Sequence, residues 1–188
     1  GEVFSDAAER YADKSFLIVP ADPARAYAGD GWQASYREVA GAVEALAGAF
    51  RAAGLGSGDR VAVLLENRPQ MLILKLALAS CGISWVPINP DYRAGEMAYV
   101  LADCTAALAI VVSARAAVMR EAAELNGGAC PVVVWEGDGL PLLPMIRDAG
   151  PSGCIMPGSE ASLLYTSGTT GRPKGCIISH EYELMMGA

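Results

Sequence analysis

The stretch VAVLLENRPQMLILKLALASCGISWVPI, residues 61–88, contains the alternation that decides the fold. Val61–Leu65 is a short apolar run of the kind that forms a strand buried on both faces. Pro69 suits the first turn of a helix, and Gly82 suits the position just past its end. Ile83–Ile88 then reads as the next strand. A strand, a helix and a strand in this order predict a βαβ crossover between parallel strands.

The same pattern continues on both sides of this unit. Upstream, Ser35 and Glu38 form a capping box, and a helix with apolar residues at helical spacing runs from there to Gly54. The elements expected downstream are a helix over 95–104, a strand over 107–112, a helix over 113–125 capped by Ser113, and a strand over 132–135. We therefore predict an α/β fold, with a largely parallel sheet and helices on both faces.

Residues 136–160 interrupt this alternation with five glycines and four prolines. Only Leu140–Arg147 could hold a helical turn or two, so the segment is predicted to be a surface connection within one domain. The expected elements that follow it are a strand over 161–165, a strand over 176–179 and a helix that begins at His180.

The composition predicts a soluble, cytoplasmic protein. Hydrophobic residues make up 53% of the 188 residues and charged residues 19%, which excludes a disordered chain. The longest apolar run, Met71–Ala79, contains Lys75 and is far shorter than the roughly 20 residues that span a bilayer. The first residues lack the basic start and apolar centre of a signal peptide. The net charge of −7 argues against a broad basic face for nucleic acid.

The cysteines and the single histidine predict no disulfide framework, no zinc site and no His-rich metal centre. An odd number of scattered cysteines without a CxxC pair favours buried, reduced thiols. These residues are Cys81, Cys104, Cys130, Cys154 and Cys176.

Residues 165–175, YTSGTTGRPKG, combine hydroxyl side chains, glycines and cations between two apolar strands. Glycines let backbone amides approach a ligand closely, and hydroxyl groups donate hydrogen bonds to oxyanions. Lys174 adds a charge that can reach a polyphosphate. The segment is not a Walker motif, because Gly175 follows the lysine where that pattern requires Ser or Thr. The residue chemistry favours a phosphate-binding loop, and a hairpin of ordinary turn residues is the alternative.

Residues 166–175, TSGTTGRPKG, resemble the phosphate-binding signature of the adenylate-forming superfamily. That superfamily includes acyl-CoA and aryl-CoA synthetases, peptide-synthetase adenylation domains and firefly-type luciferases. Residues 35–104 resemble its N-terminal segment in order and spacing, and the likeness extends from about Phe4 to the end of the chain. VPINPDYRAGEMAYVLADC (86–104) and GCIISH (175–180) are most similar to bacterial acyl-CoA ligases of the carnitine and crotonobetaine type.

This resemblance implies that a carboxylate attacks the α-phosphorus of ATP, that pyrophosphate leaves, and that coenzyme A then takes the acyl group. The residues implied to bind the phosphates are Thr166, Ser167, Gly168, Thr169, Thr170, Gly171 and Lys174. Lys174 would stabilise phosphate charge, and the Thr166 hydroxyl would contact the Mg²⁺ ion. We expect Arg172 to be a solvated charge and His180 to be an exposed structural residue.

Measured against that family, residues 1–188 are expected to be the N-terminal part of the large AMP-binding domain. The rest of that domain and a C-terminal domain with the main catalytic lysine would lie outside them, so we expect this chain alone to be inactive. The strand at Cys176–Ser179 would be an edge through which an isolated chain could form a homodimer or aggregate. Two alternatives are an adenylation domain that loads a carrier-protein thiol and a non-catalytic nucleotide-binding module of the same fold.

Overall fold

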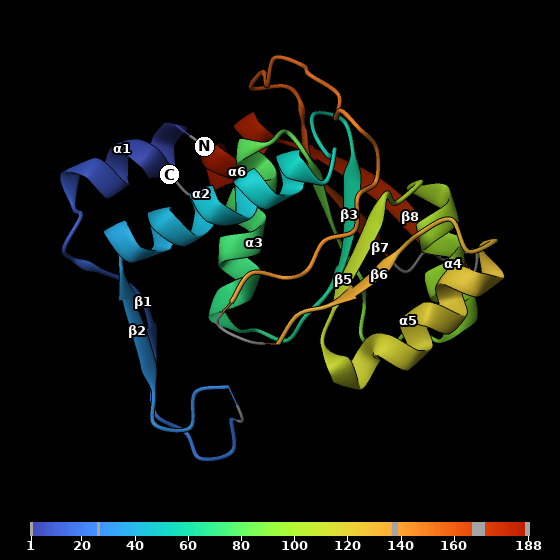
Figure 1. Cartoon of the computed structure of the whole chain (residues 1–188), viewed down its shortest axis with the longest axis horizontal. Coiled ribbons are helices and arrows are strands. Elements are labelled where there is room, and N and C mark those ends of the chain that lie inside the picture. The colour runs from blue at the N-terminus through green and yellow to red at the C-terminus, as the bar shows by residue number, and fades with distance from the viewer. Residues whose placement is uncertain (1, 26, 137–138, 167–171, 187–188) are drawn as a thin grey trace.

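A six-stranded sheet with helices on both faces forms the centre of the molecule, in the strand order β6-β5-β3-β4-β7-β8 (Figure 1). The computed structural model describes residues 2–25, 27–136, 139–166 and 172–186. Its elements are α1 (Glu2–Arg10), β1 (Ser15–Val19), β2 (Trp32–Ser35), α2 (Tyr36–Ala52), β3 (Arg60–Leu64), α3 (Pro69–Ser80), β4 (Ser84–Pro87), α4 (Ala94–Asp103), β5 (Leu108–Val111), α5 (Ser113–Leu125), β6 (Val132–Val134), β7 (Glu160–Thr166), β8 (Lys174–Ser179) and α6 (His180–Met186).

The βαβ unit predicted from residues 61–88 is confirmed as β3, α3 and β4. The two strands are parallel, with Val61 opposite Trp85. Pro69 occupies the first turn of α3, and Gly82 follows the helix at a φ of 68°. β5 and β6 continue the parallel pairing, and β7 joins the other side next to β4. Only β8 is antiparallel, and it forms the outer edge of this sheet, as the sequence predicted for Cys176–Ser179.

Alternate residues of the central strands point to opposite faces, and each face has its own hydrophobic core. Val61 and Val63 face a cluster formed with α2 and α3, which includes the fully buried Phe50. Ala62 and Leu64 face a second cluster formed with α4 and α5. Figure 1 shows these two pairs of helices on opposite sides of the sheet. A sheet covered in this way favours strands that are mostly apolar, as β3 is at 61–64 and β5 is throughout.

The sequence did not predict α1 or the antiparallel β1–β2 hairpin, which forms a separate two-stranded sheet. Aromatic rings connect these elements to the first turn of α2. The ring of Tyr36 lies 4.6 Å from that of Phe16 and 6.3 Å from that of Phe4, centroid to centroid. The predicted capping box is present, since the Ser35 side chain accepts from the Glu38 amide and the Glu38 carboxylate accepts from the Ser35 amide at 2.7 Å.

The connection between β6 and β7 crosses the turn between α2 and β3. The prediction of a helical turn within Leu140–Arg147 is wrong, since none of the described residues 139–159 is helical. Three prolines in 141–151 remove backbone donors that a helix needs. The Ile146 amide instead donates to the Ala53 carbonyl at 2.8 Å. A Cβ on Gly54, whose φ is 79°, would lie 1.9 Å from the Arg147 carbonyl oxygen, so only glycine allows this crossing.

Two smaller predictions are also corrected by the structure. Ser113 is the first residue of α5 and not its cap; its amide and hydroxyl both donate to the Glu136 carboxylate, at 2.7 and 2.6 Å. Three cysteines are buried as predicted, but Cys154 and Cys176 are exposed because they lie on the crossing segment and on the edge strand. Of the helices in the part of the chain that the structure describes, none has the length and apolar character needed to cross a membrane.

Candidate functional site

The β7–β8 hairpin carries the sequence motif at its tip. β7 lies parallel to β4, so its carboxyl end is at the same edge of the sheet as the carboxyl ends of β3 and β4. Ligands of open parallel sheets bind at this edge. The ladder between β7 and β8 ends with Thr166 opposite Lys174, and both residues are exposed. Of the predicted phosphate-binding residues, the structure therefore brings these two together; Ser167, Gly168, Thr169, Thr170 and Gly171 lie outside the described residues.

Gly175 leaves room for a tyrosine ring beside the motif. Tyr165 and Gly175 are cross-strand partners in the ladder. A Cβ on Gly175 would lie 3.1 Å from Cδ1 of Leu163 and 3.3 Å from Cζ of Tyr165, so any larger residue would push both side chains. Glycine at this position therefore leaves room for the side chains of Leu163 and Tyr165 beneath the motif.

The Tyr165 hydroxyl donates a hydrogen bond to Oδ2 of Asp103 on α4, at 2.6 Å. Burial raises the pKa of the phenol, and the hydrogen bond to the carboxylate raises this pKa further. The phenol therefore stays protonated and remains a donor. Within the motif, the guanidinium of Arg172 lies 5.5 Å from the ring centre of Tyr99, also on α4. Arg172 is exposed as expected, but it contacts an aromatic ring as well as solvent.

The opposite end of β7 is held by an ion pair. Arg60 at the start of β3 donates through Nε and Nη2 to the two carboxylate oxygens of Glu160, at 2.7 and 2.8 Å. Both side chains are largely buried. The hydrogen bonds from Arg60 lower the pKa of the Glu160 carboxyl, and the same bonds raise the pKa of Arg60. Both groups are therefore charged over the whole physiological range.

Helix α6 follows β8 directly and is attached by Glu183. This carboxylate accepts a hydrogen bond from Ser162 of β7 and pairs with Lys75 of α3 at 3.1 Å. His180, expected to be exposed, is half-buried, and its Nε2 has no hydrogen-bond partner among the described residues. Burial lowers the pKa of this imidazole, so it is neutral near pH 7. The side chain packs at the start of α6.

The described residues do not form a complete Mg²⁺ site. The Thr166 hydroxyl is one neutral oxygen, whereas Mg²⁺ takes octahedral oxygen coordination and favours carboxylates. No group of three or more His, Cys, Asp or Glu side chains placed to hold a metal occurs in residues 2–25, 27–136, 139–166 and 172–186. Thr166 could contribute a single ligand to an ion held mainly by other groups.

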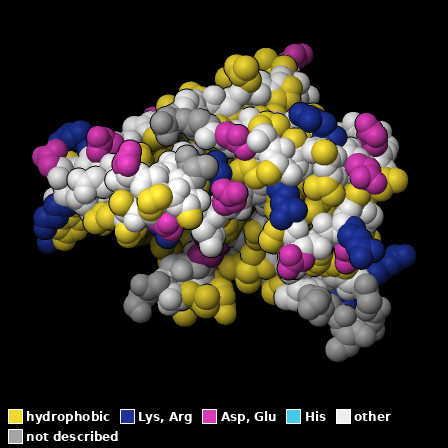
Figure 2. Space-filling model, turned by 90° about the horizontal axis from the view of Figure 1, so that it is seen from below, with side chains coloured by type: hydrophobic (Ala, Val, Ile, Leu, Met, Phe, Trp, Pro, Cys, Tyr) yellow, Lys and Arg dark blue, Asp and Glu magenta, His cyan; other side chains and the backbone are white. Residues whose placement is uncertain are grey.

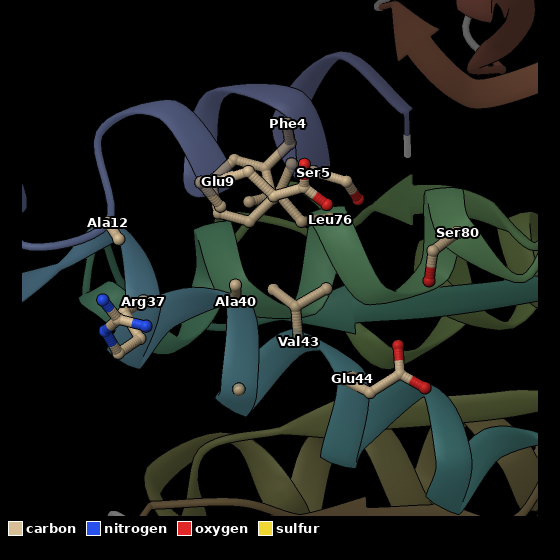
Figure 3. A pocket seen from close by; sticks show the side chains of 12 residues that line it. Phe4, Ser5, Glu9, Ala12, Arg37, Ala40, Val43, Glu44, Leu76 and Ser80 are labelled. Carbon is tan, nitrogen blue, oxygen red and sulfur yellow. The ribbon is translucent and has the colours of Figure 1, made fainter.

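Two hollows lie away from the motif. The larger, of about 650 Å³, is formed by α1, α2 and α3, and Phe4, Val43 and Leu76 line its apolar part (Figure 3). The smaller, of about 390 Å³, lies between β1 and α3, with Trp85 and Lys75 in its wall. Neither contains Thr166 or Lys174. The surface in Figure 2 shows hydrophobic side chains among both acidic and basic ones.

Comparisons with known proteins agree with this fold and motif. A sulfoacetate–CoA ligase of Cupriavidus necator is 34% identical over 175 residues, covering 92% of this chain and 33% of that protein. A crotonobetaine/carnitine–CoA ligase of Salmonella paratyphi A is 30% identical over 190 residues, covering 95% of this chain and 36% of that protein. The structure of a long-chain-fatty-acid–CoA ligase from Archaeoglobus fulgidus superposes with a TM-score of 0.78 at 26% identity, covering 95% of this chain and 36% of that one.

The chain thus spans about a third of the length of the curated relatives it matches. The resemblance to adenylate-forming enzymes, including the crotonobetaine and carnitine type, is confirmed by these matches. A family of AMP-binding enzymes matches residues 4–187, which is nearly the whole chain. The chain belongs to this family of AMP-binding enzymes.

Proposed function

We propose that this chain is the N-terminal part of the large AMP-binding domain of an enzyme that activates a carboxylic acid with ATP and transfers the acyl group to coenzyme A. Family membership supports the use of ATP. The names of the two curated relatives, both CoA ligases, support coenzyme A as the acceptor. The chain would supply the residues that bind the departing phosphates.

The observation that carries this proposal is the pairing of Thr166 with Lys174 at the end of the β7–β8 ladder. The ladder places a hydroxyl and an exposed ammonium group at the two ends of the segment SGTTGRP, residues 167–173. A lysine with an exposed side chain in this position can follow a phosphate that moves between bound and released states. The predicted hydroxyl and amide donors of 167–171 would act on the same phosphates.

The chemistry explains why a cation is needed here. A carboxylate oxygen attacks the α-phosphorus of ATP, the bond from that phosphorus to the bridging oxygen breaks, and pyrophosphate leaves with an additional negative charge. Lys174 and the hydroxyl donors would stabilise that developing charge. The thiol of coenzyme A then loses its proton and its sulfur attacks the acyl carbon, the bond from that carbon to the phosphate oxygen breaks, and AMP leaves. We propose Mg²⁺ as a further cofactor, to which the Thr166 hydroxyl would contribute one ligand.

Exchange of radiolabelled pyrophosphate into ATP, measured on the complete protein, tests the first step. The acid panel would contain sulfoacetate, crotonobetaine, carnitine and straight-chain fatty acids. We expect acid-dependent exchange, and a loss of about 100-fold in Lys174→Ala, comparable to the removal of one oxyanion donor. Thr169→Ala–Thr170→Ala should act in the same direction. The matched control is Lys14→Ala, an exposed lysine that contacts the ring of Tyr11.

Two results would contradict the proposal in different ways. Exchange that is unchanged in Lys174→Ala and in Thr169→Ala–Thr170→Ala would show that the motif does not bind the reacting phosphates. A complete protein that binds ATP but exchanges pyrophosphate with none of the acids would support the non-catalytic nucleotide-binding module instead.

A further inference from the structure

We propose that one face of helix α4, formed by Tyr99 and Asp103, positions the phosphate-binding motif by holding both strands of the hairpin that carries it. This inference rests on the function proposed above. Tyr99 and Asp103 are four residues apart in the helix, so their side chains lie on the same face, one turn from each other. Each contacts a residue on a different side of the segment 167–171 in the sequence.

The first contact holds β7. Tyr165 directly precedes Thr166, and its side chain points to the α4 face of the sheet, as does that of Leu163 two residues earlier. The phenol reaches Asp103 with a short hydrogen bond to a charged acceptor, which is among the stronger kinds. Because Gly175 has no side chain, the ring can lie across β8 while its hydroxyl meets the helix.

The second contact holds the start of β8. Arg172 stands two residues before Lys174, and its guanidinium lies over the ring of Tyr99. Pro173 between them is buried, which fixes the chain on the protein surface at this point. The side chain of Lys174 itself is exposed and ready to bind a ligand. The Arg172 guanidinium therefore contacts the ring of Tyr99, whereas the Lys174 ammonium group is available to bind a phosphate.

The contacts of Tyr165 and Arg172 matter because β8 is an edge strand with β7 as its sole strand neighbour in the described sheet. The ladder fixes β8 relative to β7, but no further described strand fixes the pair from the outer side. The α4 contacts supply that constraint at the tip. A shift of about 1 Å in a positioning group can change a rate by as much as 100-fold. Tyr165 and Asp103 are therefore positioning residues and need not touch ATP.

Substitutions in the complete protein test this inference. Tyr165→Phe keeps the ring and removes the hydroxyl, and Asp103→Ala removes the acceptor. We expect each to raise the KM for ATP in pyrophosphate exchange, and the Kd for ATP in calorimetry, by about tenfold. The KM for the acid and the thermal midpoint should stay near the wild-type values. Combining both substitutions should be no worse than either alone, because both break one interaction.

Two further variants separate positioning from general structural damage. Asp103→Asn keeps a carbonyl oxygen that can accept from Tyr165 and should recover most of the ATP affinity. Tyr27→Phe removes a phenol hydrogen bond of similar length, 2.8 Å to the Asn67 carbonyl, far from the motif in sequence and outside the hairpin. This control should leave the KM for ATP unchanged.

The outcomes are distinguishable. If Lys174→Ala abolishes exchange while Tyr165→Phe leaves the KM for ATP unchanged, the α4 inference is wrong and the proposed function stands. If Tyr165→Phe raises both KM values and lowers the thermal midpoint together, its role is structural, and the inference is again wrong. If neither Lys174→Ala nor Tyr165→Phe alters exchange, the proposed function fails as well.

Discussion

The ion pair between Arg60 and Glu160 joins β3 to β7 across β4, and we predict that Glu160→Gln lowers the free energy of unfolding by about 2 kcal/mol near neutral pH. The exposed fractions of the two side chains are 26% and 21%, so the pair is mostly removed from water. Exposed pairs contribute roughly 0.2–1 kcal/mol, and breaking a fully buried pair costs about 3–5 kcal/mol. Two short parallel hydrogen bonds place this pair between those limits.

The pH dependence of this effect has a definite sign. Hydrogen bonds from Arg60 lower the pKa of Glu160 in the folded protein. A carboxyl with a lowered folded pKa contributes stability above its unfolded pKa, which is about 4.3, and that contribution is lost as pH falls through the folded value. The difference between wild type and Glu160→Gln should therefore be complete near neutral pH and disappear in acid.

Urea denaturation followed by tryptophan fluorescence measures this difference at about pH 7 and about pH 3. The matched control is Asp13→Asn, because Asp13 pairs with Arg37 at 3.0 Å with side chains that are 88% and 67% exposed. We expect it to cost less than about 0.5 kcal/mol. The reasoning is refuted if Glu160→Gln costs no more than Asp13→Asn, or if its cost is the same at both pH values.

Three further predictions concern the core, a helix cap and the thiols. Phe50→Ala should destabilise the protein by about 4 kcal/mol in urea denaturation, because this side chain is fully buried, whereas Leu142→Ala, at a residue 93% exposed, should cost less than about 0.5 kcal/mol. Ser35→Ala should cost about 1 kcal/mol in the same assay, and no measurable loss would show that the capping box is not needed. In native protein near pH 8, iodoacetamide should modify Cys154 and Cys176 within minutes and leave the three buried thiols unmodified. Mass spectrometry measures the modification of each cysteine. Rapid modification of all five would contradict the burial of the other three.

The protection of the buried thiols has a physical cause beyond access. Burial raises the pKa of Cys104 to about 11 and that of Cys130 to about 12. The thiolate is the reactive form, so these groups are unreactive near neutral pH. Alkylation of Cys104 and Cys130 should therefore become fast after denaturation.

Much of the fold could be predicted because its strands and helices have local signals. A strand buried on both faces is apolar throughout, and Pro69 and Gly82 mark the two ends of one helix, so the boundaries in 61–88 were within two residues of those observed. The predictions that were wrong or missing also have physical explanations. Leu140–Arg147 has helical spacing of apolar residues, but its prolines and its contacts with the α2–β3 turn decide its conformation. The β1–β2 hairpin depends on packing of Phe16 against α2, and no local sequence pattern indicates this contact.

The candidate site could also be predicted only in part from the sequence. The motif predicts Thr166 and Lys174 as phosphate-binding residues, because cations and hydroxyl groups at this spacing favour a polyphosphate. The contacts of Tyr165 with Asp103 and of Arg172 with Tyr99 join residues more than sixty positions apart, and a single sequence does not show such pairings. A signal was available for the first of them, since glycine opposite an aromatic residue on an edge strand indicates a ring lying across it.

The strand order has a consequence for how the protein is made. β7 follows β6 in the chain but lies four strand positions away, about 19 Å at the usual spacing, with β5, β3 and β4 between them. Arg60 pairs with Glu160, which lies 100 residues later in the chain. Since closing such a long loop is slow compared with forming neighbouring βαβ units, β7 and β8 should add to a sheet that is already assembled. The hydrogen bond between Tyr165 and Asp103 would then form in the last stage of folding, and newly synthesised chains would complete this hairpin after β3, β4 and β5 have paired.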